Sequence, residues 1–183
     1  MVVAVKNFLF VRHFATRGNV ERRYIGRTDE PICESKEPDA GFPRGEYSLF
    51  TSPMLRCVQT AGILFPGRQG TVISDLRELD FGVFEGKTAD ELADCPEYSA
   101  WLDTACTGDI PGGESVAEFK DRACRAFLEI AGHGGDSAAV VTHGGVVMAI
   151  LERFGYPERG FYDYHLPNGG TIFRRYEDGK LVE

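Results

Sequence analysis

Two short, continuously apolar segments lie far apart in the chain, and each leads directly into a histidine. Residues 7–11 (NFLFV) precede Arg12 and His13, and residues 138–142 (AAVVT) precede His143. Apolar runs of this length without polar alternation are typical of strands buried on both faces, as in parallel sheets. The carboxyl ends of parallel strands meet at one edge of a sheet, where open α/β folds bind ligands. If the two strands are parallel neighbours, both imidazoles lie at that edge.

Strand and helix patterns alternate along the rest of the chain. Further strands are expected at residues 47–51 and 71–74 and in a C-terminal hairpin that turns at Asp178-Gly179. Helices are expected at residues 52–65, 88–94, 96–106 and 115–131, and from Gly145 to a stop at Gly155. This alternation predicts a three-layer α/β/α sandwich with a mostly parallel central sheet. The 183 residues suit a single domain, residues 1–183, with one sizeable core.

Cap residues predict where two of these helices begin. Ser52 and Pro53 fit an N-cap and a first helical residue, and Ser115 with Glu118 fits a capping box. The first assignment places Arg56 in the first turn, where the helix dipole is positive and a cation is disfavoured unless an anion is near. Pairing with a surface carboxylate is one solution. A phosphate bound between Arg56, Arg12 and the strand-end histidines is the other.

Composition excludes several classes of partner. The formal net charge of −8 disfavours nucleic acid, and no apolar run approaches the roughly 18 residues of a membrane span. The N-terminal segment lacks a signal-peptide pattern, so a cytoplasmic location is expected. Five scattered cysteines without CxxC spacing argue against disulfides and zinc, and we expect no metal and no cofactor.

Carboxylates follow the expected strand at residues 71–74. Glu78 and Asp80 lie within the segment RELDFG. Such groups are commonly solvated at the surface, but a carboxyl group in a cationic phosphate pocket could also protonate a leaving oxygen.

Five segments together resemble the histidine phosphatase superfamily, the phosphoglycerate-mutase-like proteins. They are residues 10–19 (FVRHFATRGN), 23–31 (RYIGRTDEP), 52–61 (SPMLRCVQTA), 78–86 (ELDFGVFEG) and 142–146 (THGGV). The resemblance runs from about residue 8 to residue 175. Each match alone is weak, whereas the ordered set is specific.

The resemblance implies a phosphoglycerate-mutase-like fold and a phosphohistidine mechanism. His13 would be the nucleophile, and Glu78 would be the general acid for the leaving alcohol and then the base for water. The residues expected to bind the phosphoryl oxygens are Arg12, Thr16, Asn19, Arg56, His143 and Gly144. The partner would be a small phosphorylated metabolite, with no metal required.

Two segments depart from the family pattern. Phe14 stands where the signature has glycine. If the backbone there had a positive φ, phenylalanine would be strained by about 1–2 kcal/mol; otherwise its ring could narrow the pocket or stack on substrate. Residues 35–47 contain two prolines and several turn-prone residues where the family has a helix, so a loop or an exposed patch is expected.

Three functions remain open. We favour a phosphomonoesterase over a phosphoglycerate mutase, because residues 90–111 offer little material for a lid over the site. Residues 22–31, residues 78–88 (ELDFGVFEGKT), Trp101 and the segment PGGES also resemble alpha-ribazole phosphatases, although broad-specificity phosphatases look similar. The third alternative is a non-catalytic, phosphate-binding regulatory module. Residues expected to pack rather than to line the pocket rim are Tyr162, Tyr164, His165 and Asn168.

Overall fold

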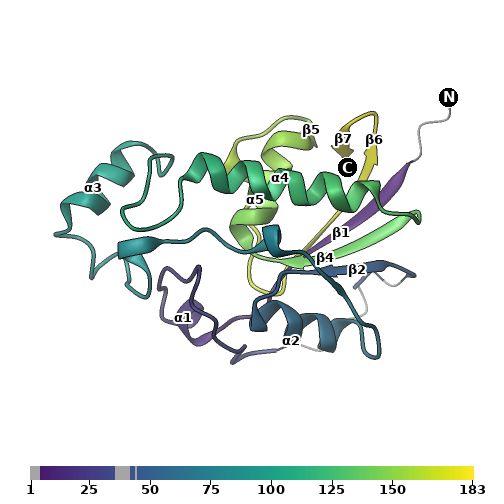
Figure 1. The fold of residues 1–183 in the computed structure, drawn as a ribbon, viewed down its shortest axis with the longest axis horizontal. Helices are drawn as coiled ribbons and strands as arrows, with labels where there is room; N and C mark the ends of the chain where they lie inside the picture. Colours follow the sequence, from purple (N-terminus) through teal and green to yellow (C-terminus); the bar gives the residue numbers. More distant parts are fainter. Residues whose placement is uncertain (1–4, 36–41, 44) are drawn as a thin grey trace.

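The computed structural model describes residues 5–35, 42–43 and 45–183, and its centre is a sheet with helices on both faces (Figure 1). The strands are Lys6–Arg12 (β1), Ser48–Thr51 (β2), Thr71–Val72 (β3), Ser137–Thr142 (β4), Gly155–Tyr156 (β5), Thr171–Glu177 (β6) and Lys180–Val182 (β7). The α-helices are Arg17–Val20 (α1), Leu55–Leu64 (α2), Pro96–Asp103 (α3), Val116–Gly132 (α4) and Gly144–Phe154 (α5). Short 3₁₀ helices lie at Ser74–Leu76, Gly82–Phe84 and Phe161–Tyr164.

The sheet is mostly parallel. Its strand order is β3-β2-β4-β1-β6-β7-β5, and β4 pairs in parallel with both β1 and β2. Only β6 is antiparallel to its neighbours among the described strands. The register places Arg12 opposite Thr142, and the His13 N–H donates to the Thr142 carbonyl at 2.9 Å. His13 and His143 therefore follow neighbouring strands at the same edge, as the sequence predicted.

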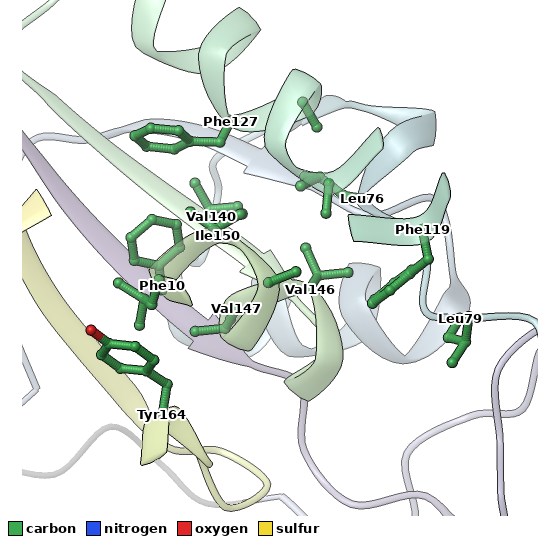
Figure 2. Close-up of a cluster of buried hydrophobic side chains, with 14 of the residues drawn as sticks. Phe10, Leu76, Leu79, Phe119, Phe127, Val140, Val146, Val147, Ile150 and Tyr164 are labelled. Carbon is green, nitrogen blue, oxygen red and sulfur yellow. The ribbon is translucent and has the colours of Figure 1, made fainter. Parts of the chain in front are cut away.

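Two hydrophobic clusters fill the two faces of the sheet. Successive strand residues point to opposite faces, so Phe10 joins the larger cluster beneath α4 and α5, whereas Leu9 joins the smaller one beneath α2. Figure 2 shows Phe10 in the larger cluster with Phe127 of α4 and Ile150 of α5. This arrangement confirms the α/β/α sandwich.

The predicted N-cap of α2 is wrong, whereas that of α4 is confirmed in position but lacks its capping box. Helix α2 begins at Leu55 with Met54 as its N-cap; the Ser52 hydroxyl lies 2.8 Å from Nε2 of His143 and accepts only a longer hydrogen bond, of 3.4 Å, from the Met54 N–H. Ser115 does precede α4, but its side chain makes no cap hydrogen bond, so the predicted capping box with Glu118 is absent.

Other predicted elements are partly corrected. Residues 88–94 form turns rather than a helix, although Thr88 and Glu91 exchange the two side-chain-to-backbone hydrogen bonds of a capping box. The strand expected at residues 71–74 is only Thr71–Val72. The C-terminal hairpin is confirmed, with positive φ at Asp178 and Gly179. The loop expected at residues 35–47 falls largely outside the described residues.

The described helices are also too short or too polar to cross a bilayer.

Candidate active site

His13, which directly follows β1, is 4% exposed and held in one orientation. Its Nδ1 lies 2.7 Å from the Phe14 carbonyl oxygen, so Nδ1 carries the proton and donates it. Burial lowers the pKa of His13 to about 3; the hydrogen bond to Phe14 opposes this, and the charges of Arg56 and Arg12 lower the pKa further. The imidazole is therefore neutral, and its Nε2 has no hydrogen-bond partner in the described part of the chain.

Arg56, in the first turn of α2, is fully buried. Its guanidinium donates from Nη1 to the Thr28 carbonyl (2.7 Å), from Nη2 to the Gly26 carbonyl (2.8 Å) and from Nε to Nδ1 of His143 (3.3 Å). These contacts fix its plane without neutralising its charge. Two of its five N–H donors remain for another acceptor.

Arg12, the last residue of β1, is a second cation without an acidic partner. Its Nη1 donates to the Leu166 carbonyl at 2.6 Å, and its Nε is buried with no partner among the described residues. Burial lowers the pKa of Arg12, while nearby Glu78 opposes the shift; an arginine nevertheless stays charged. In the described residues no ion pair joins Arg12 or Arg56 to a carboxylate. Buried charges are normally paired, so this cluster favours a bound anion.

His143 lies beside His13, with ring centroids 5.2 Å apart and an angle of 69° between the planes. Burial, and next the charge of Arg56, hold the pKa of His143 well below its usual value. Since Nδ1 accepts from Arg56, the proton is on Nε2 and is donated to the Ser52 hydroxyl at 2.8 Å. Both ring nitrogens are thus used within the protein. Direct contact with a phosphoryl oxygen requires one of them to exchange its partner.

Glu78 lies at the N-terminus of α5. Its Oε2 accepts from the Gly145 N–H and its Oε1 from the Leu79 N–H, both at 3.1 Å. A Cβ at position 145 would collide with the Glu78 carboxylate, so this close approach requires glycine. Asp80 does not join this arrangement: it accepts from the Gly82 N–H at 2.9 Å and stabilises the loop.

Arg122 of α4 holds the backbone of the loop that carries Glu78. Its Nη1 donates to the carbonyls of Asp75 (2.9 Å) and Arg77 (2.6 Å), and its Nη2 donates to the carbonyl of Glu78 (2.9 Å). Nε and Nη2 also bind the two carboxylate oxygens of Glu114, at 2.6 and 2.7 Å. The sequence does not single this residue out, because an arginine within an amphipathic helix is ordinarily a surface group.

Thr16 and Asn19 support the backbone around His13. Thr16 is buried and caps α1, accepting from the Asn19 N–H at 3.3 Å. Asn19 Oδ1 accepts from the Thr16 N–H and from Nδ2 of Asn168, which also donates to the His13 carbonyl at 3.1 Å. Asn168 is therefore part of the site, where packing was the favoured role.

Gly144 begins α5 directly against the Arg12 guanidinium. A Cβ added at position 144 would lie 3.3 Å from Cζ of Arg12.

Phe14 is neither strained nor directed into the site. It is absent from the residues with positive φ, so the strain expected from the missing glycine does not arise. Its ring is 5% exposed and belongs to the smaller hydrophobic cluster. Its edge also packs over Gly169, where an added Cβ would lie 2.8 Å from the ring.

A cavity of about 670 Å³ opens beside Arg12, Glu78 and Gly144. Tyr162 and His165 line it, so of the two roles open to them the pocket rim holds, rather than the packing that the sequence favoured. Tyr164 is buried and does pack, with its hydroxyl 3.2 Å from the Pro157 carbonyl. In residues 5–35, 42–43 and 45–183 no cluster of His, Cys, Asp or Glu side chains is suited to hold a metal ion.

Comparison with solved structures supports this fold. A phosphoglycerate mutase from Thermus thermophilus superposes with a TM-score of 0.72 at 30% identity, covering 97% of this chain and 96% of that one. A "putative alpha-ribazole-5'-P phosphatase" from Escherichia coli K-12 superposes with a TM-score of 0.82 over 96% of this chain and 93% of that one. At 19% identity, the second likeness concerns the fold alone.

Comparison of sequences identifies the family. Proteins named "Probable phosphoglycerate mutase GpmB" from Cronobacter sakazakii and Klebsiella pneumoniae are each 34% identical to this chain, over 81% of its length and 76% of theirs. The sequence model of the Histidine phosphatase superfamily (branch 1) matches residues 8–182. The chain therefore belongs to the histidine phosphatase superfamily.

Proposed function

We propose that this protein is a phosphomonoesterase that transfers a phosphoryl group from a small organic phosphate to His13 and then to water. One observation carries the proposal. A neutral imidazole with a free Nε2 lies beside two guanidiniums, the buried Arg56 and the half-buried Arg12, that have no carboxylate partner among the described residues. Such a cluster attracts a phosphate dianion and aims a nucleophile at it.

The chemistry follows from the hydrogen bonds. Nε2 of His13 attacks phosphorus as the bond to the ester oxygen breaks, and Glu78 supplies the proton that this oxygen needs. Arg12 and Arg56 stabilise the charge on the phosphoryl oxygens, with Gly144 and Asn19 as further donors. The Phe14 carbonyl keeps the proton on Nδ1 and stabilises the positive charge of the phosphohistidine. Glu78 then takes a proton from the water that releases inorganic phosphate.

Phosphoglycerate mutase activity is the second candidate, supported by the names of the 34%-identical relatives. It uses the same phosphohistidine but returns the phosphoryl group to a phosphoglycerate instead of water. The resemblance of residues 22–31, residues 78–88, Trp101 and the segment PGGES to alpha-ribazole phosphatases makes alpha-ribazole phosphate a substrate to test. A non-catalytic module is disfavoured, since His13, Glu78 and both arginines are retained together.

Brief incubation with labelled substrate should leave an acid-labile, base-stable phosphate on the wild type and none on His13→Ala. His133→Ala is the matched control, because this exposed histidine follows α4 at the opposite edge of the sheet. Phosphate esters, including alpha-ribazole phosphate and 3-phosphoglycerate, are then compared without added metal. Release of inorganic phosphate supports the phosphatase, whereas interconversion of phosphoglycerates supports the mutase. Equal slow hydrolysis by wild type and His13→Ala would refute both.

A further inference from the structure

We call His13, Arg12, Arg56 and His143 the phosphate-binding cluster, in keeping with the proposed function. The cavity lies beside this cluster and begins where the ester oxygen would leave. Arg12, Glu78 and Gly144 form its inner end, and its volume of about 670 Å³ falls within the range of pockets that enclose whole organic ligands. The part of the substrate released after protonation by Glu78 would therefore enter this space.

Aromatic side chains from separate segments line the cavity. The rings of Tyr24 and Phe81 lie 5.1 Å apart, and those of Tyr24 and Trp101 lie 6.0 Å apart. A second group consists of Phe161 and Tyr162, with ring centroids 5.1 Å apart and planes at 90°. These spacings are those of attractive aromatic pairs, and an inserted ring could make the same contacts.

Aliphatic and benzyl side chains from the core complete the wall. Leu79, Phe119 and Met148 line the cavity, and Figure 2 shows Leu79 and Phe119 at one end of the buried cluster. The polarisable thioether of methionine packs favourably on aromatic rings. The wall thus extends the hydrophobic core outward, and these side chains offer no hydrogen-bonding groups to a polar ligand.

The charges that line the cavity are largely balanced. Lys120 pairs with Glu152 at 2.7 Å, and its ammonium lies 4.4 Å from the centre of the Phe161 ring. Arg12 belongs to the phosphate-binding cluster, and His165 is an exposed titratable group at the wall. A carboxylate on the leaving group would therefore meet no unpaired arginine or lysine here beyond Arg12, and it would face the carboxylates of Glu78 and Glu152.

We infer that the cavity binds the alcohol portion of the substrate and that this portion is bulky and aromatic, rather than a small hydroxy acid such as glycerate. The inference rests on the proposed function, because that function places the phosphate at His13. It makes the cavity the element that selects among phosphate esters.

Binding separates this inference from catalysis. The probes are 3-phenylpropylphosphonate and propylphosphonate, which share the anionic group and cannot be hydrolysed. Burial of the ring predicts an affinity for the phenyl compound higher by about tenfold or more, measured by calorimetry. Equal affinities would overturn the inference whether or not the protein is an enzyme.

Turnover provides the second comparison. 3-Phenylpropyl phosphate and propyl phosphate have primary alkyl leaving groups of similar acidity, so a difference in kcat/KM reports on the cavity. We expect kcat/KM for the phenyl ester to be about tenfold or more higher than for propyl phosphate, and kcat/KM for 3-phosphoglycerate to be the lowest of the three. A preference for 3-phosphoglycerate would overturn the inference. If neither alkyl ester is hydrolysed faster than by His13→Ala, the proposed phosphatase fails, while the phosphonate affinities still decide the cavity.

Variants locate the effect. Tyr162→Ala should reduce the preference for the phenyl compounds about threefold and leave the propyl compounds unchanged. Tyr156→Ala is the matched control, since both tyrosine side chains are 59% exposed and Tyr156 does not line the cavity. Met148→Gln, which adds an amide to the wall at similar volume, should reduce the preference about fivefold. Unchanged preference in both Tyr162→Ala and Met148→Gln would contradict the assignment.

Discussion

The proposed phosphate-binding cluster and the adjoining cavity are built in opposite ways. In the cluster, His13, Arg56 and His143 are at most 4% exposed, and hydrogen bonds fix each of them. The cavity wall is made of apolar contacts, and one of its rings, Tyr162, is 59% exposed. Group transfer depends on fixed donors aimed at one position, whereas apolar burial is non-directional and tolerates change. Substitutions in the cluster should thus slow every substrate, and substitutions in the cavity should alter only the choice among substrates.

The largest effect is expected at Arg56. Arg56→Met keeps a side chain of similar length but removes the positive charge of Arg56 and the N–H groups that Arg56 would donate to the phosphate. Loss of such preorganised donors costs about 3–4 kcal/mol of transition-state stabilisation, or roughly 10²-fold to 10³-fold in kcat/KM. The loss should be equal for propyl and 3-phenylpropyl phosphate in steady-state assays. A loss confined to the phenyl ester would remove the distinction between cluster and cavity.

Phe14 tests whether an aromatic residue adjacent to His13 belongs to the scaffold or to the cavity. Its ring is buried in the smaller hydrophobic cluster beneath α2. Phe14→Ala should therefore lower the free energy of unfolding by about 3 kcal/mol, as expected for a truncated core phenylalanine. Urea denaturation measures this change. Phe173→Ala, at a side chain 45% exposed, is the control and should change stability far less. The preference for the phenyl ester should persist in Phe14→Ala; its disappearance would place the ring in the cavity.

Arg122 should affect turnover through Glu78. Arg122→Leu removes three donors to the carbonyls of residues 75–78, so the general acid loses its fixed position. We expect kcat/KM to fall about 10-fold to 100-fold for esters with poor leaving groups and much less for esters with good ones, as in Glu78→Gln. Arg125→Leu is the control on the same helix, because that side chain is 67% exposed and pairs only with Asp75 at 3.6 Å. Equal slowing across leaving groups in Arg122→Leu would indicate a purely structural role.

Much of the candidate site could be predicted because it depends on local patterns and one topological rule. The apolar runs before His13 and His143 indicate buried strands, and parallel pairing brings their ends together. Arg56 stood out because a cation in a first helical turn needs a nearby anion. These inferences use residues adjacent in sequence, together with the regular geometry of sheets and helices.

The remaining features depend on partners that are distant in sequence. Ser52 has the local signature of an N-cap, yet its hydroxyl binds His143, 91 residues away, and the helix begins later. Arg122 has no local signature for its contacts to the loop at residues 75–78. The cavity combines side chains from β1, α3, α4, α5, the 3₁₀ helix Phe161–Tyr164 and several loops, so no single stretch of sequence predicts it.

The smallest expected effect is the change in folding stability per unit of pH. It distinguishes the buried histidines of the cluster from the exposed groups of the cavity. Folding lowers the pKa of His13 from about 6.5 to about 3, and the pKa of His143 is lowered in the same direction. Between these two pH values the unfolded chain binds more protons than the folded one, so stability is greatest above pH 6.5 and falls as the pH drops toward 3. Each such histidine contributes a slope of up to about 1.4 kcal/mol per pH unit.

Urea denaturation at pH values from 7 to 4 measures this slope. His13→Gln removes one titrating group and should flatten the curve, while Tyr162→Phe, at an exposed residue of the cavity wall that does not titrate in this range, should leave it unchanged. Because His13 stays neutral down to a low pH, the folded enzyme should also retain its nucleophile at pH 5. Stability curves for wild type and His13→Gln that run parallel from pH 6.5 to 4 would show that His13 is not buried in its neutral form. The contrast between a buried cluster and an open cavity would then not hold.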